Sequence, residues 1–492
     1  MADARKYFKG STDGKAPLSH DPLEGAKERY DVIVVGSGLA GLTAANVLGK
    51  AGRKVLLLEQ HYNFGGLATW FKRRGGHVFD ISLHGFPVGM KKTCRKYWNA
   101  KIADSIEPLT GIRFDNPQFR FDTTFTEEDF TGKLVSILGA APAAVAAFFA
   151  EVRATNFYED SGETIATFFE RHFPGRNDIH RLLLEPISYA NGSTLDDPAL
   201  AYRIVFGNFM NKGVYTFSGG TDRLVKEMKS ELESHGVELH NKVQVDRIRV
   251  EGGRVTGIEA HGRFIAADAV VSNASLKATV ERLVGAEHFR PEFAATVGAV
   301  RLNTSSCQVY IGLRPGESIP FVTDLLFTST RPTFESSALC DMDGESRTFS
   351  FYYPKTRPGL DRYTIVSSTN ARWNDWASLD ESAYAAAKDR LVHDTLAAIE
   401  RYVPGVRAKI EHVEAATPRT FQFYTQAPEG TSFGTKFEGL KPSMEIHEEV
   451  RGLYHAGSVG IIMSGWLGAA NYGVIVANKC DAWLHGLIEV SA

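Results

Sequence analysis

The stretch DVIVVGSGLAGLTAANVLGKAGRKVLLLE, residues 31–59, decides the fold of this chain. Its apolar run at 32–35 predicts a buried strand, and apolar residues at helical spacing after the glycines predict a helix. Between them stand Gly36, Gly38 and Gly41, in the spacing G-x-G-x-x-G. The first glycine permits a tight turn, the second lets the backbone approach a pyrophosphate at the positive end of the helix, and the third lets helix and strand pack closely. The pattern predicts a dinucleotide-binding turn.

A second apolar run, residues 55–58, ends at Glu59. A carboxylate at this place accepts hydrogen bonds from the ribose of an adenosine. The strand, the helix, the second strand and the acid therefore occur in the order and spacing of a dinucleotide-binding unit. A glycine-rich turn alone would be weaker evidence, because such turns are common. The glycine turn does not separate FAD from NAD.

Two glycine pairs follow the acid. Gly65 and Gly66 precede Leu67, and Gly75 and Gly76 come eight residues later. A paired glycine soon after the ribose-binding acid lets the chain pass tightly against a bulky cofactor, which suits an extended FAD. The alternative is an ordinary loop and a hairpin whose turn is the second pair.

These motifs resemble those of the phytoene desaturase, carotenoid isomerase and retinol saturase group of flavoproteins, which are relatives of the amine oxidases. The shared features are the glycine fingerprint, the glycine pair and the dipeptide Phe79-Asp80. Leu67 and Ala68 are small and neutral where amine oxidases and many desaturases carry Arg. This difference favours the isomerase and saturase branch.

Two later segments extend the resemblance. The pair at 219–220 opens an expected helix, a β-meander follows to residue 273, and in the family the backbone near Val243 contacts the adenine side. Near the C-terminus, Gly457-Ser458 ends a short strand and Gly465 begins a helix of small residues. Such a helix can point its amide end at the flavin ring. The family usually has Gly-Asp and Pro-Gly-x-Gly at these places, so only part of that pattern is present here.

The resemblance implies an α/β fold: a Rossmann-like FAD-binding domain of the amine oxidase and phytoene desaturase type with a mixed-sheet α+β substrate domain. We expect a flexible leader at 1–30. The FAD-binding domain is expected to be discontinuous and to comprise residues 31–104, 213–275 and 450–492. The substrate domain is expected to be discontinuous as well and to comprise residues 105–212 and 276–449. The expected FAD-binding residues are Gly36, Gly38, Leu39, Ala40, Gly41, Glu59, Gly65, Gly66, Leu67, Val243, Gly457, Ser458 and Gly465.

Composition agrees with an ordinary enzyme. The chain has 492 residues, 43% of them hydrophobic, and a net charge of −3. This charge gives no reason to propose nucleic acid as a partner. The four cysteines are far apart and form neither a metal-ligand spacing nor a disulfide framework, so we expect no metal and a reducing cytoplasm.

Membrane contact is left open by the sequence. Residues 1–30 lack the apolar core of a signal peptide, and no stretch reaches the ~20 apolar residues of a spanning helix. The segment from Leu134 to Val152 predicts either a monotopic contact beside a substrate entrance or a buried helix. The basic run at 91–96 predicts either contact with anionic lipid or a solvated face. The expected location is the cytoplasm, with peripheral binding to the inner face of a membrane as the alternative.

The flavin must supply most of the chemistry, because a protein of this kind orients an apolar substrate against the cofactor. His84 lies four residues beyond Asp80 and would lie near the flavin in the family layout. The ordinary pKa of histidine suits proton exchange with a polyene, whereas the alternative is a structural histidine. Trp466 and Tyr472 are candidates for the pocket wall or for the core.

Three classes of function fit the sequence. The first is an FAD-dependent oxidoreductase acting on C=C bonds of a hydrophobic polyene or isoprenoid, by desaturation, saturation or cis-trans isomerisation, with a separate electron acceptor or donor. The second is an amine-oxidase-like flavoenzyme on a small polar substrate. The third binds flavin without turnover. A long apolar cavity favours the first class and an aromatic cage at the flavin favours the second.

Overall fold

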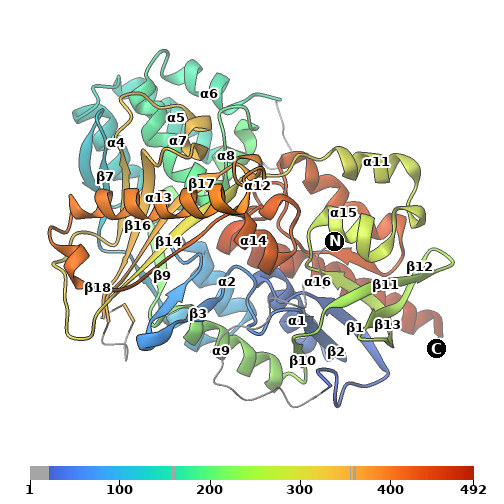
Figure 1. The fold of residues 1–492 in the computed structure, drawn as a ribbon. Coiled ribbons are helices and arrows are strands. Elements are labelled where there is room, and N and C mark those ends of the chain that lie inside the picture. Colours follow the sequence, from blue (N-terminus) through green and yellow to red (C-terminus); the bar gives the residue numbers. More distant parts are fainter. Residues whose placement is uncertain (1–20, 157–161, 355, 358–361, 492) are drawn as a thin grey trace.

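The computed structural model describes residues 21–156, 162–354, 356–357 and 362–491. These residues form two halves, each built on a seven-stranded sheet. Figure 1 shows the first sheet at the lower right, the second at the left, and a group of helices above the second sheet. The two halves are threaded together, because the chain passes several times from one to the other.

The first sheet contains the glycine turn. Its strand order is β10-β2-β1-β13-β12-β11, and β19 pairs with β13. The pairs of β10, β2, β1, β13 and β19 are parallel, and β11 and β12 complete an antiparallel meander. The apolar runs of the central strands are buried on both faces, as a parallel sheet requires. Bounds are β1 Arg29–Val35, β2 Val55–Glu59, β10 Glu238–Asn241, β11 Val245–Glu251, β12 Arg254–Ala260, β13 Arg263–Ser272 and β19 Leu453–His455.

Helices cover this sheet and share one hydrophobic core with it. The contact between α1 and α16 is close, since a Cβ at Gly473 would lie 2.3 Å from the carbonyl oxygen of Ala40. Small residues in the C-terminal helix therefore let the two helices approach. The helices are α1 Leu39–Lys50, α2 Gly89–Tyr97, α3 Ala100–Asp104, α9 Gly220–Ser234 and α16 Gly465–Ser491.

The second sheet has the order β18-β14-β17-β16-β15-β7-β8. It is antiparallel except where β15 pairs with β7. In β14, Val309 and Ile311 pack in the core that includes α13 Glu381–Glu400, whereas the alternate side chains face the other way. Bounds are β7 Ile112–Asp115, β8 Arg120–Thr123, β14 Ser305–Leu313, β15 Leu325–Ser329, β16 Ser346–Tyr352, β17 Thr364–Ala371 and β18 Ile410–Ala416.

Five helices form a phenylalanine-rich core beside the second sheet. They are α4 Glu127–Ser136, α5 Pro142–Arg153, α6 Ile165–His172, α7 Asn177–Asn191 and α8 Ala199–Met210. Shorter strands and helices join the two halves. They are β3 Trp70–Lys72, β4 Val78–Asp80, β5 Phe86–Pro87, β6 Ile106–Pro108, β9 Val214–Phe217, α10 Leu276–Ala278, α11 Pro291–Ala299, α12 Trp373–Ala377, α14 Pro418–Thr425 and α15 Leu440–Glu449.

A buried ion-pair cluster joins the two halves. Arg357, just after β16, lies 3.0 Å from Asp80 and 2.8 Å from Asp222 of α9. The side chains of Arg357 and Asp80 are 2% and 0% exposed. The amide of Thr221 also donates to Asp80 at 3.0 Å. The acid of the Phe-Asp dipeptide is therefore part of the contact between the halves.

The structure corrects three expectations. Residues 21–30 do not belong to a flexible leader, because Leu23 is fully buried and β1 already begins at Arg29; residues 1–20, where the rest of the expected leader falls, lie outside the described residues. The segments 276–299 and 440–449, expected in the substrate domain, pack into the core of the first sheet. The segment 134–152 is not one helix: α4 and α5 are separated before Pro142, which fits only the first turn of a helix.

The apolar residues of α5 face inward. Val145, Phe148, Phe149 and Val152 are buried in the phenylalanine-rich core, which favours the packed-helix alternative for this segment. Among the described residues there is no helix long and apolar enough to cross a membrane.

Candidate functional site

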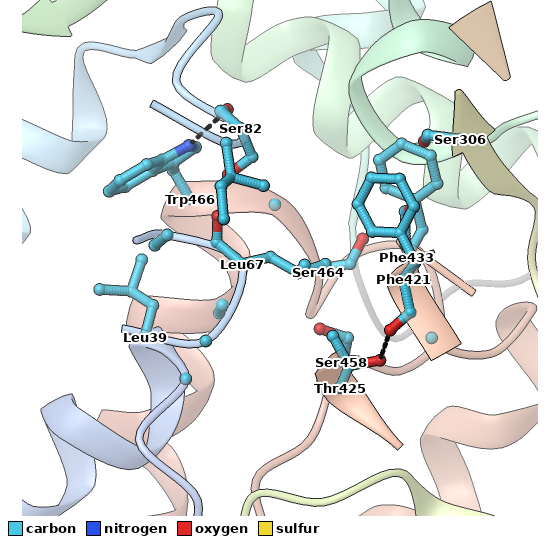
Figure 2. A pocket seen from close by; sticks show the side chains of 18 of the residues that line it. Leu39, Leu67, Ser82, Ser306, Phe421, Thr425, Phe433, Ser458, Ser464 and Trp466 are labelled. Atoms are coloured by element: carbon cyan, nitrogen blue, oxygen red, sulfur yellow. Dashed lines mark hydrogen bonds between the residues drawn. The ribbon is translucent and has the colours of Figure 1, made fainter. Parts of the chain in front are cut away.

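One large cavity, of about 840 Å³, extends from the glycine turn to the second sheet and to α7 and α8. Figure 2 shows part of it, with Leu39, Leu67 and Trp466 on one side of the view and Ser306, Phe421 and Phe433 on the other. Both sheets contribute to its wall. The cavity is therefore the place where the two halves of the molecule could act together.

The glycine turn has the expected tight geometry. Gly36 has a φ of 96°, and a Cβ at Gly41 would lie 2.2 Å from the carbonyl oxygen of Gly36. At Gly38 a Cβ would lie 2.5 Å from Oδ1 of Asn273, the residue that follows β13. The amino end of α1 carries no side-chain cap and no acid in its first turn. This end is free to receive an anion.

Glu59 is held in place at the end of β2. The backbone amide and the hydroxyl of Ser37 donate to its carboxylate at 2.8 and 2.6 Å, and the amide of His61 donates at 2.8 Å. Burial raises the pKa of this carboxyl, and these hydrogen bonds oppose the rise. The backbone amide of Val243 donates to the carbonyl oxygen of Glu59 at 2.8 Å, which places Val243 beside the acid.

The two glycine pairs have separate tasks. Gly65 and Gly66 line the cavity with positive φ, and a Cβ at Gly66 would lie 2.8 Å from Cα of Gly38. Gly75 and Gly76 form the turn between β3 and β4, so the hairpin alternative holds for that pair.

The amino end of α16 forms another part of the wall. Gly465 has a φ of 65° at the first residue of the helix, and Ser458 lies on the cavity wall before it. Between them Ile461 has a φ of 64°, which is unusual for a β-branched residue. It is buried and lines the cavity. Strain of this kind occurs where the surrounding structure holds a functional loop in place.

Most of the residues expected to bind FAD line this cavity. Gly41 and Gly457 do not: Gly41 packs against the glycine turn, and a Cβ at Gly457 would lie 2.3 Å from the carbonyl oxygen of Ala274. These two glycines are close-packing positions. The expected residues that line the cavity are Gly36, Gly38, Leu39, Ala40, Glu59, Gly65, Gly66, Leu67, Val243, Ser458 and Gly465.

His84 lines the cavity beside the second sheet. Its Nδ1 lies 2.8 Å from the hydroxyl of Ser350, and its Nε2 lies 3.2 Å from that of Ser368. Burial lowers the pKa of His84 to about 4, against an opposing effect of Asp80. The expectation of a near-neutral pKa was therefore wrong, because the ring is desolvated and hydrogen-bonded only to neutral groups.

The two aromatic candidates separate. Trp466 lines the cavity, and its Nε1 donates to the carbonyl oxygen of Ser82 at 3.2 Å, as Figure 2 shows. Tyr472 is fully buried and hydrogen-bonded to Ser443, which in turn contacts His455 at 2.6 Å. Tyr472 belongs to the core. In the described part of the chain no group of His, Cys, Asp and Glu could hold a metal ion.

Two wall residues, Asn273 and Arg282, were not predicted from the sequence. Asn273 lies against the glycine turn, and its Nδ2 donates to the carbonyl oxygen of Ala456 at 2.6 Å. Arg282 stands in a π-helix, residues Thr279–Val284, and lines the cavity without an ion-pair partner among the described residues. π-helical turns often mark functional sites. Asn273 could have been predicted from its position, because it is the first residue after a parallel strand, where ligand-binding residues often lie.

The part of the cavity wall that lies beside α7 and α8 is apolar. Side chains from α7, α8, β15 and the loop before α4 supply this part. The residues are Phe125, Pro186, Ile187, Ile204, Val205, Phe209, Leu325 and Phe327. An apolar ligand next to the glycine turn would bury its surface here.

The residues fit FAD. A buried carboxylate at the end of β2 suits a ribose, the uncapped end of α1 suits a pyrophosphate, and the glycines at 38 and 66 leave room where a Cβ would intrude. The end of α16 lies on the same cavity. These features come from four separate parts of the chain.

Comparison with known proteins agrees. Residues 39–421 match the model of the flavin containing amine oxidoreductases. All-trans-retinol 13,14-reductase of Homo sapiens is 24% identical over 90% of this chain and 84% of its own length. The chloroplastic prolycopene isomerase of Arabidopsis thaliana is 23% identical over 93% of this chain and 84% of its own length.

Among solved structures, an oxidoreductase from Methanosarcina mazei has a TM-score of 0.64 at 18% identity, over 91% of this chain and 100% of that one. The expected fold class is confirmed, with a Rossmann-like FAD-binding half and a mixed sheet. The cofactor is FAD. This chain belongs to the flavin containing amine oxidoreductase family.

Proposed function

We propose that this protein is an FAD-dependent oxidoreductase that acts on C=C bonds of a hydrophobic polyene or isoprenoid. The observation that carries the proposal is the cavity of about 840 Å³ that joins the glycine turn to an apolar wall. The relatives named above support it, because their names specify a retinol reductase and a prolycopene isomerase. FAD supplies the electron or hydride transfer when it is bound.

The chain's own residues would bind the cofactor and orient the substrate. Gly38 and Glu59 with their neighbours would hold the dinucleotide part, and Ser458 and Gly465 would lie against the ring. The walls of α7 and α8 exclude water from an apolar chain. His84 would orient hydroxyl groups of the second sheet as a neutral ring. Its role as a proton shuttle stays a prediction that the low pKa disfavours.

The amine-oxidase-like alternative has weaker support. A short polar pocket rich in Asp and Glu would favour a small cationic substrate, and the carboxylates among the described cavity residues are Glu59 and Glu414. The first is held at the end of β2 by Ser37, and the second is paired with Arg73 at 2.8 Å. Both carboxylates are therefore already engaged within the protein and are not placed to bind a substrate ammonium group.

The test uses purified protein with its flavin chemically reduced under argon. Addition of a polyene such as all-trans-retinol should reoxidise the flavin, and mass spectrometry should find a product two hydrogens heavier. Oxidised enzyme that removes two hydrogens would assign desaturation, and an unchanged mass with a shifted retention time would assign isomerisation. Reduction of the oxidised flavin by putrescine, which would itself be oxidised to the imine, with no change in any polyene, would support the amine-oxidase alternative.

The electron partner and the membrane contact are further parts of this proposal. A water-insoluble substrate has to reach the cavity, and peripheral binding to a lipid surface would provide the route. Sedimentation with vesicles that contain anionic lipid tests this part, and protein that stays in the supernatant would contradict it.

A further inference from the structure

Five neutral polar side chains form a continuous band on the cavity face of the second sheet. The alternation of β14, β16 and β17 turns these side chains to the same face. Ser306 lies opposite Asn370, and Ser368 lies between Gln308 and Thr348 on its two neighbouring strands. We call these residues, Ser306, Gln308, Thr348, Ser368 and Asn370, the polar band.

Part of the polar band is satisfied within the protein. Nε2 of Gln308 donates to the carbonyl oxygen of Ile81 at 2.8 Å, and the hydroxyl of Tyr310 donates to its Oε1. Ser368 contacts Nε2 of His84 at 3.2 Å. These side chains need no ligand.

Ser306 and Asn370 differ from the others. Nδ2 of Asn370 donates to the carbonyl oxygen of Ser188 at 2.9 Å, which leaves its Oδ1 as an acceptor. The hydroxyl of Ser306 has no hydrogen-bond partner among the residues that the structure describes. Residues opposite each other on antiparallel strands have their Cβ atoms about 4.5–5.5 Å apart. One donor and one acceptor thus stand side by side on the cavity wall.

The polar band carries no charge. The charged residues of the cavity wall, Glu59, Arg73, Arg282, Lys388 and Glu414, all come from other elements. His84, which contacts the band, is neutral at pH 7 because burial lowers its pKa to about 4. A carboxylate or an ammonium group would find no counter-charge within the band. A hydroxyl group, which both donates and accepts, matches the pair of Ser306 and Asn370.

We infer that the substrate is a polyene alcohol, whose hydroxyl group is bound by Ser306 and Asn370, and not a pure hydrocarbon. The inference rests on the proposed function and narrows it. A hydrocarbon chain would offer no partner to the Ser306 hydroxyl or to Oδ1 of Asn370, which could then pair only with each other, whereas a ligand hydroxyl would accept from the first and donate to the second. The apolar walls of α7 and α8 would hold the carbon chain.

The test measures binding of three probes to the oxidised holoenzyme from the change in flavin absorbance. The probes are all-trans-retinol, the deoxy hydrocarbon of the same carbon skeleton, and all-trans-retinoic acid. We expect the alcohol to bind about tenfold more tightly than the hydrocarbon, the usual scale for one or two hydrogen bonds. Equal binding of the hydrocarbon, or tightest binding of the acid, would overturn the inference and leave the proposed function intact. Failure of every polyene to bind would overturn both.

Variants locate the effect. Ser306→Ala should reduce the preference for the alcohol to about threefold or less, with FAD content unchanged, and Ser306→Thr should restore it. Ser367→Ala is the matched control, because Ser367 is a buried neighbour on β17 that does not line the cavity. A preference for the alcohol that survives in the FAD-loaded Ser306→Ala variant would show that Ser306 does not bind the substrate.

Discussion

The two seven-stranded sheets contribute to the cavity in different ways. The first sheet presents backbone: Gly36, Gly38 and Gly66 leave space where a Cβ would collide with a neighbour or need a strained φ. The second sheet presents side chains, which alternate between the core under α13 and the cavity. The first sheet is therefore suited to a cofactor of fixed shape. On the second sheet, single side-chain substitutions can change which ligand is bound while the backbone stays the same.

The largest expected effect on cofactor binding comes from filling the backbone space of the first sheet. In Gly38→Val the new Cβ would lie 2.5 Å from Oδ1 of Asn273. We expect the Kd for FAD to rise about 100-fold or more, since overpacking of this kind costs about 1–3 kcal/mol before the lost phosphate contacts are counted. The flavin absorbance of the purified protein measures this directly.

Gly298→Val in α11 is the control, because no atom lies within 4 Å of a Cβ there. It should retain FAD. A yellow Gly38→Val protein with wild-type flavin content would break the distinction between the two sheets, because the glycine turn would then not be the cofactor site.

The same distinction explains what the sequence predicts. Gly36, Gly38, Gly41 and Glu59 have a fixed spacing within one β-α-β unit, so their geometry follows from local chain rules. The family match confirms the fold and FAD. The individual binding residues stay predictions.

The wall of the second sheet follows from no local rule. Ser306 and Asn370 are 64 positions apart in the chain and meet only through the register of β14 and β17. The positive φ of Ile461 is equally hidden, because glycine or asparagine is expected in that conformation. His84 was placed near the cavity by the resemblance, but its pKa depends on burial, which only the fold determines.

The contact between the two halves should control the stability of the fold in the way that the glycine turn controls cofactor binding. Arg357→Met removes the partner of Asp80, whose side chain is fully buried, and we expect a loss of about 3–5 kcal/mol in the free energy of unfolding. Denaturation of the holoenzyme in urea, followed by both flavin and tryptophan fluorescence, measures this loss and shows whether the halves unfold together.

Arg95→Met is the comparison, because the ion pair of Arg95 with Asp104 has side chains that are 55% and 62% exposed. It should cost no more than about 1 kcal/mol. Equal effects of the two variants would show that the Arg357 cluster does not hold the halves together.

His84 tests the side-chain part of the site. Its folded pKa of about 4 lies below the ordinary 6.5, so the ring is neutral from pH 5 to 8 and turnover should show no step from this group. The unfolded chain binds the proton more tightly, so the stability due to His84 is present above pH 6.5 and is lost as the pH falls towards 4. We expect His84→Gln to lower kcat by about tenfold or less, below the ~10²-fold typical of a lost general acid or base.

The measurement is kcat between pH 5 and 9 for both proteins. A step near pH 6–7 that disappears in His84→Gln, together with a loss of about 10²-fold, would establish the proton shuttle and contradict a neutral, orienting ring.

The smallest expected effect concerns a side chain on the first sheet's side of the cavity, where backbone dominates. Arg282 lines the cavity from its π-helix, and the glycine pair is followed by Leu67 and Ala68, which offer no cation. We expect Arg282→Gln to raise the Kd for FAD by about threefold to tenfold at low salt, because an exposed charge contributes about 0–1 kcal/mol or little more. The wild-type Kd should rise with NaCl more steeply than that of the variant. Salt screens the attraction between Arg282 and the phosphates, and the variant has already lost this attraction. Arg249→Gln on β11, outside the cavity wall, should change neither the Kd nor its salt dependence. Identical salt slopes for wild type and Arg282→Gln would show that the backbone of the first sheet binds the phosphates without help from this side chain.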